Sequence, residues 1–182
     1  MTTALQSLQR RRSRSKVTDP APSPDELASL VAAMGSVADH SGLRPWRLIE
    51  LRGDARSILG EALAEAAGKP DKRDKLIAKA QRAPLVLAIV VSPRKSEKVP
   101  LWEQESVASG VAHLLSLLLD EAGWGVIWRT GPHTRDAAVH AAHRLAEGEY
   151  LLGWLYIGTA PDQGESPKPR KPLDLARHLS AL

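Results

Sequence analysis

The amino-acid sequence predicts an α+β fold in which helices flank a small mixed sheet in three layers. The first observation behind this prediction is the segment Leu101–Ala122, which has the pattern of one long apolar helix. The second is the uninterrupted apolar run Leu85–Val91, which is typical of a strand buried on both faces. The third is that helical patterns dominate the start of the chain while tight hairpin signals are few.

Helices prevail in the first half of the chain. The clearest begins at Pro24, with Ser23 as its N-cap and two acidic residues in its first turn. In chain order we expect a short helix at Ala4–Arg12, an extended linker at Asp19–Pro22, the helix after Ser23, a strand at Arg47–Leu51, and helices at Ala55–Ala67 and Lys72–Gln81.

The central helix has clear boundaries and an unusual surface. Pro100 precedes its first turn, Glu103 and Glu105 favour the positive end of its dipole, and Gly123 ends it. Its apolar residues spread around most of its circumference, which predicts burial on most sides. Its first half carries mainly small residues, so another backbone, including that of a partner chain, could approach closely there.

The second half alternates strands and helices after this element. We expect a strand at Gly125–Trp128, a helix at Thr134–Leu145, a strand at Leu151–Gly158, and a tail from Pro161 that ends in a short helix at Leu173–Leu179. The 182 residues form one domain, with a basic arm over residues 1–20 and an extended tail over residues 161–182.

Composition narrows the class of protein. Hydrophobic residues make up 43% of the chain and the net charge is +4, while a mean hydropathy of −0.24 is ordinary for a soluble protein. No run of about 18 uncharged apolar residues predicts a membrane span. The chain has no cysteine, which excludes disulfides, thiol catalysis and cysteine-ligated metals, and which fits a cytoplasmic location.

Three segments could carry chemistry. Arg11, Arg12 and Ser13 offer two guanidinium groups and a hydroxyl, a good set for a phosphate monoester. The same arm could instead be a solvated basic segment, a nucleic-acid patch or a targeting sequence. His40 lies in a polar loop, where it could donate to a ligand or cap the loop. Arg129–Gly131 could bind an anion or form the turn before a helix capped by Thr134.

The sequence gives little support for a metal site, covalent catalysis or a nucleotide-binding motif. His113, His140 and His143 stand at helical spacings without a set of carboxylates, so we expect structural or surface roles and no metal site. The chain contains no nucleophile–base pair, P-loop or dinucleotide-binding glycine fingerprint. An enzyme of this sequence would therefore position a cofactor that does the chemistry.

Taken together, the segments resemble the nitroreductase family, and within it the short bacterial members of the YdjA type. The resemblance runs from about Leu8 to Pro161. It is carried by Arg-Arg-Ser, Asp-Pro-Ala-Pro, Asp-His-Ser-Gly-Leu-Arg-Pro-Trp-Arg, Val-Pro-Leu-Trp-Glu-Gln-Glu, Gly-Val-Ile-Trp-Arg-Thr-Gly and Leu-Gly-Trp-Leu-Tyr-Ile-Gly-Thr, in that order. It implies a nitroreductase-like fold and a homodimer that binds FMN at the subunit interface, with the long helices packed across the two-fold axis.

The resemblance also implies site residues by position. The expected FMN contacts are Arg11, Arg12, Ser13, Ser36, His40, Trp128, Arg129 and Thr130. Among them, Arg129 is expected near the phosphate and His40 is expected to reach the flavin of the other subunit. NAD(P)H is expected to approach along Glu121, Ala122, Gly123, Trp124, Gly125 and Val126.

One departure from the family pattern concerns Ser36. Family members commonly carry an arginine there, expected at the pyrimidine end of the flavin, where negative charge gathers on reduction. Ser36 offers a hydrogen bond without a charge, and Arg44 or Arg47 could compensate.

The implied function is electron transfer by a ping-pong mechanism, from NAD(P)H through FMN to nitroaromatic or quinone-like acceptors. The alternative is a homodimer of the same fold that binds flavin or another ligand with little turnover. A nucleic-acid role for the basic ends is the weaker alternative, and it predicts salt-dependent binding without a flavin spectrum.

Overall fold

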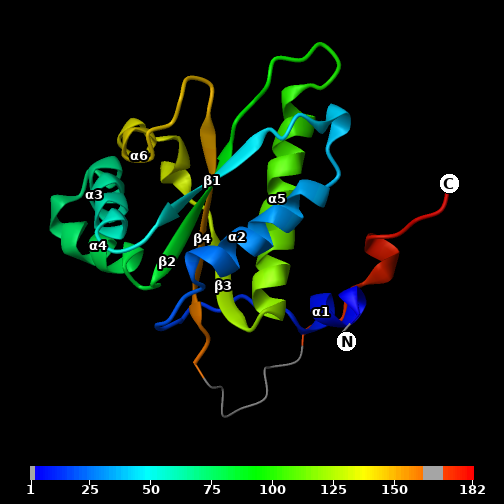
Figure 1. Ribbon diagram of the computed structural model, residues 1–182, viewed down its shortest axis with the longest axis horizontal. Coiled ribbons are helices and arrows are strands. Elements are labelled where there is room, and N and C mark those ends of the chain that lie inside the picture. Colours follow the sequence, from blue (N-terminus) through cyan, green and yellow to red (C-terminus); the bar gives the residue numbers. More distant parts are fainter. Residues whose placement is uncertain (1–2, 162–169) are drawn as a thin grey trace.

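The computed structural model describes residues 3–161 and 170–182, and it confirms the α+β class (Figure 1). Its sheet has four strands in the order β1-β2-β4-β3, where β1 is Trp46–Leu51, β2 is Leu85–Val91, β3 is Trp124–Arg129 and β4 is Tyr150–Thr159. All three strand pairs are antiparallel, whereas we expected a mixed sheet. Strand β3 lies at one edge of the sheet.

Six α-helices surround this sheet in the described part of the chain. They are α1 (Ala4–Arg10), α2 (Pro24–Ala33), α3 (Ala55–Ala67), α4 (Arg73–Ala80), α5 (Leu101–Glu121) and α6 (Ala137–Ala142). Short 3₁₀ turns at Met34–Ser36, His40–Gly42, Pro70–Lys72 and Pro132–Arg135 connect them, and the only regular element in residues 170–182 is a turn at Leu175–Arg177.

Two expected helices are shorter than their sequence patterns indicated. The segment expected as one helix from Thr134 starts as a 3₁₀ turn, and α6 begins after Asp136, whose carboxylate caps it by accepting from the Ala138 N–H. The Thr134 hydroxyl instead donates back to the Gly131 carbonyl. In the tail, the expected terminal helix is reduced to the single turn at Leu175–Arg177.

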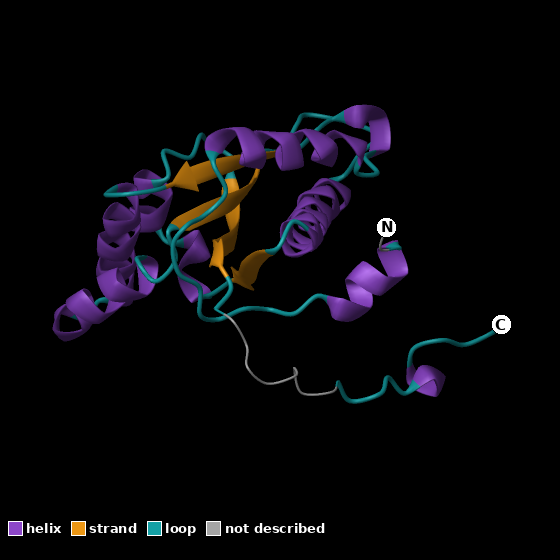
Figure 2. Cartoon of the chain, turned by 60° about the horizontal axis from the view of Figure 1, so that its bottom comes forward, coloured by secondary structure: helices purple, strands orange, loops and turns teal. Residues whose placement is uncertain are grey.

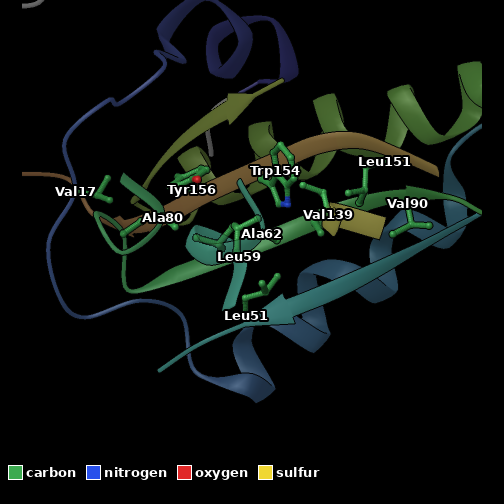
Figure 3. Packing of buried hydrophobic residues seen from close by; sticks show 13 residues of the cluster. Val17, Leu51, Leu59, Ala62, Ala80, Val90, Val139, Leu151, Trp154 and Tyr156 are labelled. Atoms are coloured by element: carbon green, nitrogen blue, oxygen red, sulfur yellow. The ribbon is translucent and has the colours of Figure 1, made fainter. Parts of the chain in front are cut away.

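Hydrophobic packing divides the molecule into two halves, one on each face of the sheet. Helices α3, α4 and α6 cover one face, and Leu59, Trp154 and Tyr156 belong to its core (Figure 3). Helices α2 and α5 cover the other face, where Leu87, Leu115 and Ile157 lie buried. The layers can be followed in Figure 1, where α3 and α4 lie on the opposite side of the strands from α5.

Helix α5 buries a single stripe against the sheet. The buried positions are Gln104, Val107, Ala108, Val111, Ala112, Leu115, Ser116 and Leu119, which follow one another at helical spacing. On its outer side Trp102 is 69% exposed and Leu114 is 43% exposed. In the single chain, part of the apolar surface of α5 is therefore exposed, although the sequence predicted burial on most sides.

Both ends of α5 are held by other segments. At its N-terminal end, the buried Gln104 side chain bonds Arg94 and the Val99 carbonyl, which fixes the preceding loop. At its C-terminal end, the Ser7 hydroxyl of α1 lies 3.1 Å from the Glu121 carboxylate. Helix α1 consequently lies beside the end of α5 and away from α3 and α4 (Figure 2).

The structure contains no helix able to cross a membrane among the residues it describes.

Candidate functional site

The end of β3 carries the second group of expected cofactor residues, and strand alternation sends their side chains to opposite faces of the sheet. Trp128 pairs with Leu155 and packs with the core on the α5 face, where its ring meets His113 edge-on at 5.0 Å. Arg129 pairs with Trp154 and places its guanidinium 5.7 Å from the Tyr156 ring centroid, on the α3–α4 face. Thr130, the next residue, is exposed.

Two polar atoms at this point lack a partner. The indole Nε1 of Trp128 and the Nε of Arg129 are buried, and neither makes a hydrogen bond with the described residues. A buried donor without an acceptor costs about 1–3 kcal/mol, so adjacent examples at one strand end are unusual. A bound group could supply an acceptor to Trp128 on the α5 face or to Arg129 on the α3–α4 face.

Close packing against β4 fixes this strand end. A Cβ added to Gly153 would lie 2.3 Å from the Arg129 carbonyl oxygen and 3.0 Å from Trp128 Nε1. Gly153 also has a positive φ of 128°. Only glycine allows β4 to approach so closely in this conformation, and Gly153 therefore helps to position both residues.

The basic arm contacts β3 at Val126 and pairs with the end of β4. The Arg14 N–H donates to the Val126 carbonyl at 2.8 Å, and Thr18 pairs with Thr159 through both of its backbone groups. Arg11, Arg12 and Ser13 lie between this contact and α1, whose Ser7 is bonded to Glu121, and no described hydrogen bond joins them to Trp128, Arg129 or Thr130.

The arginines of the arm are held from within the chain. Arg12 Nη1 donates to the carbonyls of Gln9, Arg10 and Arg11 at 2.9–3.1 Å, at the negative end of α1. Arg170 of the C-terminal tail donates to the Arg11 carbonyl. Arg170 is a candidate that the sequence analysis missed, because it was grouped with the cationic tail and nothing in the sequence shows that the tail returns to the arm.

Ser36 and His40 lie at the other end of α5. His40 is exposed, and its Nδ1 lies 2.7 Å from the Glu103 carboxylate, while Ser36 is exposed in the preceding turn. Glu103 and Glu121 are 18 residues apart in α5, about 27 Å along a helix. Because Ser7 is bonded to Glu121, His40 and the basic arm of one chain lie at opposite ends of this helix and cannot share one small ligand.

The two arginines that could compensate for Ser36 are differently placed. Arg47 forms a two-pronged ion pair with Glu149, at 2.8 and 2.6 Å, and this pair lowers the pKa of Glu149 to about 2. Arg44 is exposed and its backbone N–H donates to the Asp39 carboxylate. The charge of Arg47 is thus largely neutralised by its partner.

The expected NAD(P)H approach segment spans two environments. Glu121, Ala122 and Gly123 are exposed at the end of α5, whereas Gly125 and Val126 are buried in β3. A Cβ on Gly125 would meet Val17 of the arm at 2.7 Å. Only the first part of the segment, with half-buried Trp124 at its boundary, is open to a second molecule in this chain.

A cavity of about 220 Å³ lies beside the end of β3, on the α3–α4 face. Its cationic lining consists of Lys79, Arg82 and Arg129, and Trp154 and Tyr156 form an aromatic wall. Burial raises the pKa of Tyr156, while the charges of Arg129 and Arg82 act in the opposite direction. The sequence analysis selected neither Lys79, in the expected helix Lys72–Gln81, nor Arg82, which follows that helix.

The remaining histidines have structural partners. His143 is buried, with Nδ1 at 2.7 Å from the Val139 carbonyl, and its Nε2 accepts from Trp154 Nε1 at 2.9 Å. Burial lowers the pKa of His143, which fits the neutral ring that these two bonds require. His140 contacts the Thr134 carbonyl, and no group of three metal-binding side chains occurs among the described residues.

Comparisons with known proteins agree with this architecture. A sequence model of the nitroreductase family matches residues 8–159. The protein named "Putative NAD(P)H nitroreductase YdjA" of Escherichia coli K12 is 33% identical over 160 residues, covering 86% of this chain and 87% of the relative. A Haemophilus influenzae relative with the same enzyme name is 29% identical over 168 residues, covering 89% of this chain and 91% of its own.

Solved structures show the same fold. A nitroreductase-like family protein from Bacillus cereus superposes with a TM-score of 0.84 at 21% identity, covering 100% of this chain and 97% of its own. The FMN- and NADPH-dependent nitroreductase NfnB from sphigopyxis sp. strain HMH, as its Y88A mutant, gives a TM-score of 0.79 at 19% identity, covering 98% of each chain.

Proposed function

Because the chain belongs to the nitroreductase family, we propose that this oxidoreductase transfers electrons from NAD(P)H through bound FMN to nitroaromatic or quinone-like acceptors. The proposal places it in the cytoplasm, in line with its lack of cysteine. FMN, when bound, supplies the centre that accepts a hydride from the donor and passes electrons to the acceptor.

The observation that carries the proposal is the strand end at Trp128 and Arg129. Its two buried donors lack partners among the described residues, and Arg14 of the basic arm is bonded to Val126 of the same strand. A flavin mononucleotide offers what this region lacks, a dianionic phosphate for the arm and carbonyl and nitrogen acceptors for buried N–H groups. Arg11, Arg12 and Ser13 would hold the phosphate together with Arg170, and Trp128 and Thr130 would border the ring.

The proposal includes a homodimer whose sites are shared between subunits. The separation of His40 from the basic arm, about 27 Å along α5, prevents both from serving one flavin within a chain. A two-fold axis across the outer side of α5 would bring His40 of one subunit to the arm of the other. The exposed Trp102 and Leu114 supply apolar surface for such a contact.

The electron donor and the acceptor would bind next to the flavin ring one after the other. The open part of the expected NAD(P)H segment, Glu121–Gly123, lies next to the arm and is exposed. If donor and acceptor both approached along this exposed segment, they would bind one after the other. This arrangement favours a ping-pong order, in which the donor leaves before the acceptor binds.

The experiment that tests the proposal compares FMN with riboflavin, which lacks the phosphate. Arg12→Ala should weaken FMN binding by about 1.5–3 kcal/mol, roughly 10- to 150-fold, because a charged hydrogen bond to the phosphate is lost. Riboflavin binding should not change. Flavin fluorescence quenching during titration of the apoprotein measures both affinities.

Arg10→Ala is the matched control, because Arg10 is exposed on the same arm and its loss removes the same charge. If the Arg12 substitution only disturbed the packing of α1, the affinities for FMN and riboflavin would fall equally. A lost phosphate contact would lower the affinity for FMN alone. Equal affinity of the wild-type protein for riboflavin and FMN would rule out the phosphate assignment.

A second candidate function is flavin binding with little turnover. It is favoured by the uncharged Ser36 together with the ion pair that neutralises Arg47. Anaerobic addition of NADPH to the flavin-loaded protein separates the two functions, because rapid bleaching of the flavin absorbance is expected only of the oxidoreductase.

A further inference from the structure

Resting on the function proposed above, we propose that Lys79, Arg82 and Arg129 supply the positive charge at the electron-rich end of the flavin that Ser36 does not provide. The three cations line one cavity beside Thr130 and Gly131. In this assignment the side chain of Arg129 serves the ring, and the phosphate is left to the arm.

The cavity has the composition that a flavin ring edge requires. Its walls are largely apolar and aromatic, with Leu63 and Leu76 facing Trp154 and Tyr156, while its charged lining is entirely cationic. No aspartate or glutamate contributes to it. A planar, partly anionic group would find both an apolar slot and counter-charges there.

The charges of this cavity are not neutralised by the protein. Among the described residues, no ion pair or hydrogen bond involves the side chain of Lys79, Arg82 or Arg129, and Arg129 Nε is buried without an acceptor. Arg47 is the contrasting case, since its Nε and Nη2 donate to the two carboxylate oxygens of Glu149. A cation already paired contributes little field to a ligand, whereas three unpaired cations contribute more, even where solvent partly screens them.

Position also links the cavity to the expected flavin site. Arg129 and Thr130, which line it, are both expected cofactor residues, while the cavities lined by Trp102 and by Arg73 contain neither. The side chain of Arg129 lies on the far side of β3 from Trp128. A ring bordered by Thr130 at the strand end would therefore have its edge next to the cavity mouth.

The chemical consequence follows from where charge gathers. A two-electron reduced flavin carries its negative charge at the pyrimidine end, so nearby cations bind the reduced form more tightly than the oxidised form. This difference in affinity raises the midpoint potential. The three cations would thereby raise the midpoint potential of the flavin, which the uncharged Ser36 does not do.

The test uses the FMN-loaded full chain with the double substitution Lys79→Met and Arg82→Met. Both side chains are exposed, so the fold should survive their replacement. The matched control is Lys72→Met with Lys75→Met, which removes the same charge from exposed positions around α4 that do not line the cavity. Midpoint potential and affinities for oxidised FMN and riboflavin are measured for all three proteins.

We expect the double variant to lose at least tenfold more affinity for reduced than for oxidised FMN, which corresponds to a midpoint potential about 30 mV lower. Oxidised FMN and riboflavin should be affected equally, because the cavity would contact the ring that they share. The control should keep the wild-type potential.

Two results would overturn the proposal. One is a potential equal to that of the control, and the other is an affinity loss confined to FMN, which would place these cations at the phosphate. If the double variant does not fold, Lys79→Met alone gives the same comparison against Lys75→Met. Failure of the wild-type protein to bind any flavin would instead refute the proposed function itself.

Discussion

The two faces of the sheet differ in how completely this chain covers them. On the α3–α4 face, Leu59 is fully buried among residues of the same chain. On the α5 face the inner stripe of the helix is equally well buried, but its outer side exposes Leu101, Trp102 and Leu114 beside a groove that reaches Gly110 and His113. The core on the α3–α4 face is covered by residues of the same chain, whereas the outer side of α5 is an exposed apolar surface.

This difference separates two kinds of stability. Burial on the α3–α4 face is independent of any partner, so its contribution to folding should not depend on protein concentration. Burial on the outer side of α5 would require association, so its contribution should increase with protein concentration. Substitutions on the two faces should therefore have distinguishable effects.

The largest effect is expected at the closed face. Leu59→Ala should lower the free energy of unfolding by about 2–5 kcal/mol, because it removes a fully buried side chain and leaves a cavity. Urea denaturation should show the same loss at low and high protein concentration. Leu114→Ala on the open face is the comparison, and its cost should appear only in the concentration range where the protein associates.

The next effect concerns the groove on α5. A Cβ at Gly110 would meet only the Val37 side chain of its own chain, at 3.4 Å, so Gly110→Leu should be tolerated by the monomer. Across a close helix–helix contact it should overpack, at a cost of about 1–3 kcal/mol. Sedimentation velocity should then show a shift towards monomer with the fold retained. A variant that assembles as tightly as the wild type would show that α5 is not the interface.

A smaller effect should make the closed face sensitive to acid. Burial lowers the pKa of His143 below its unfolded value, so the unfolded chain binds an extra proton as the pH falls through about 6.5. Stability should therefore decrease from pH 7 to pH 5, and less steeply in His143→Gln, whose amide can still donate and accept. Thermal unfolding midpoints across this range give the comparison. Parallel pH curves for the two proteins would exclude His143 as the cause.

The smallest expected effect is a shift in midpoint potential, which tests whether cations on the α5 face or on the α3–α4 face stabilise the reduced flavin. Ser36→Arg adds a cation at the α5 face, and by itself a partly screened charge should raise the FMN midpoint potential by a few tens of millivolts, where about 30 mV corresponds to about 1.4 kcal/mol. If Lys79 and Arg82 already supply the field, the increase should be smaller in the wild type than in their double variant. Equal increases in both proteins would indicate that the two faces act independently.

Sequence patterns predicted the elements whose causes are local. The boundaries of α3 and β2 agree with the expected ranges Ala55–Ala67 and Leu85–Val91, because helical periodicity and an apolar run between turn signals are written in neighbouring residues. The helix expected from Thr134 is shorter because Asp136 is the better cap. The pairing of the strands depends on contacts between distant segments, and there the expectation of a mixed sheet differs from the antiparallel result.

The candidate site was less accessible to sequence reasoning. The family resemblance selected Arg129 by position, but only the alternation of β3 against β4 shows that its side chain leaves the α5 face. Lys79 belongs to α4 and Arg82 follows this helix, and only the placement of α4 against the end of β3 brings both residues to the cavity. Arg170 depends on the path of a tail that carries no pattern of its own.

The length of α5 has a further consequence if the proposed dimer holds. Each flavin would take its arm from one subunit and its His40 from the other, so each subunit would contribute to two sites at once. A subunit defective in Arg12 paired with one defective in His40 would gather both defects in one site and leave the second site intact. Two subunits that are each inactive as homodimers could thus form an active heterodimer. Inserting or deleting one turn of α5 would change the distance between the two sites of the dimer.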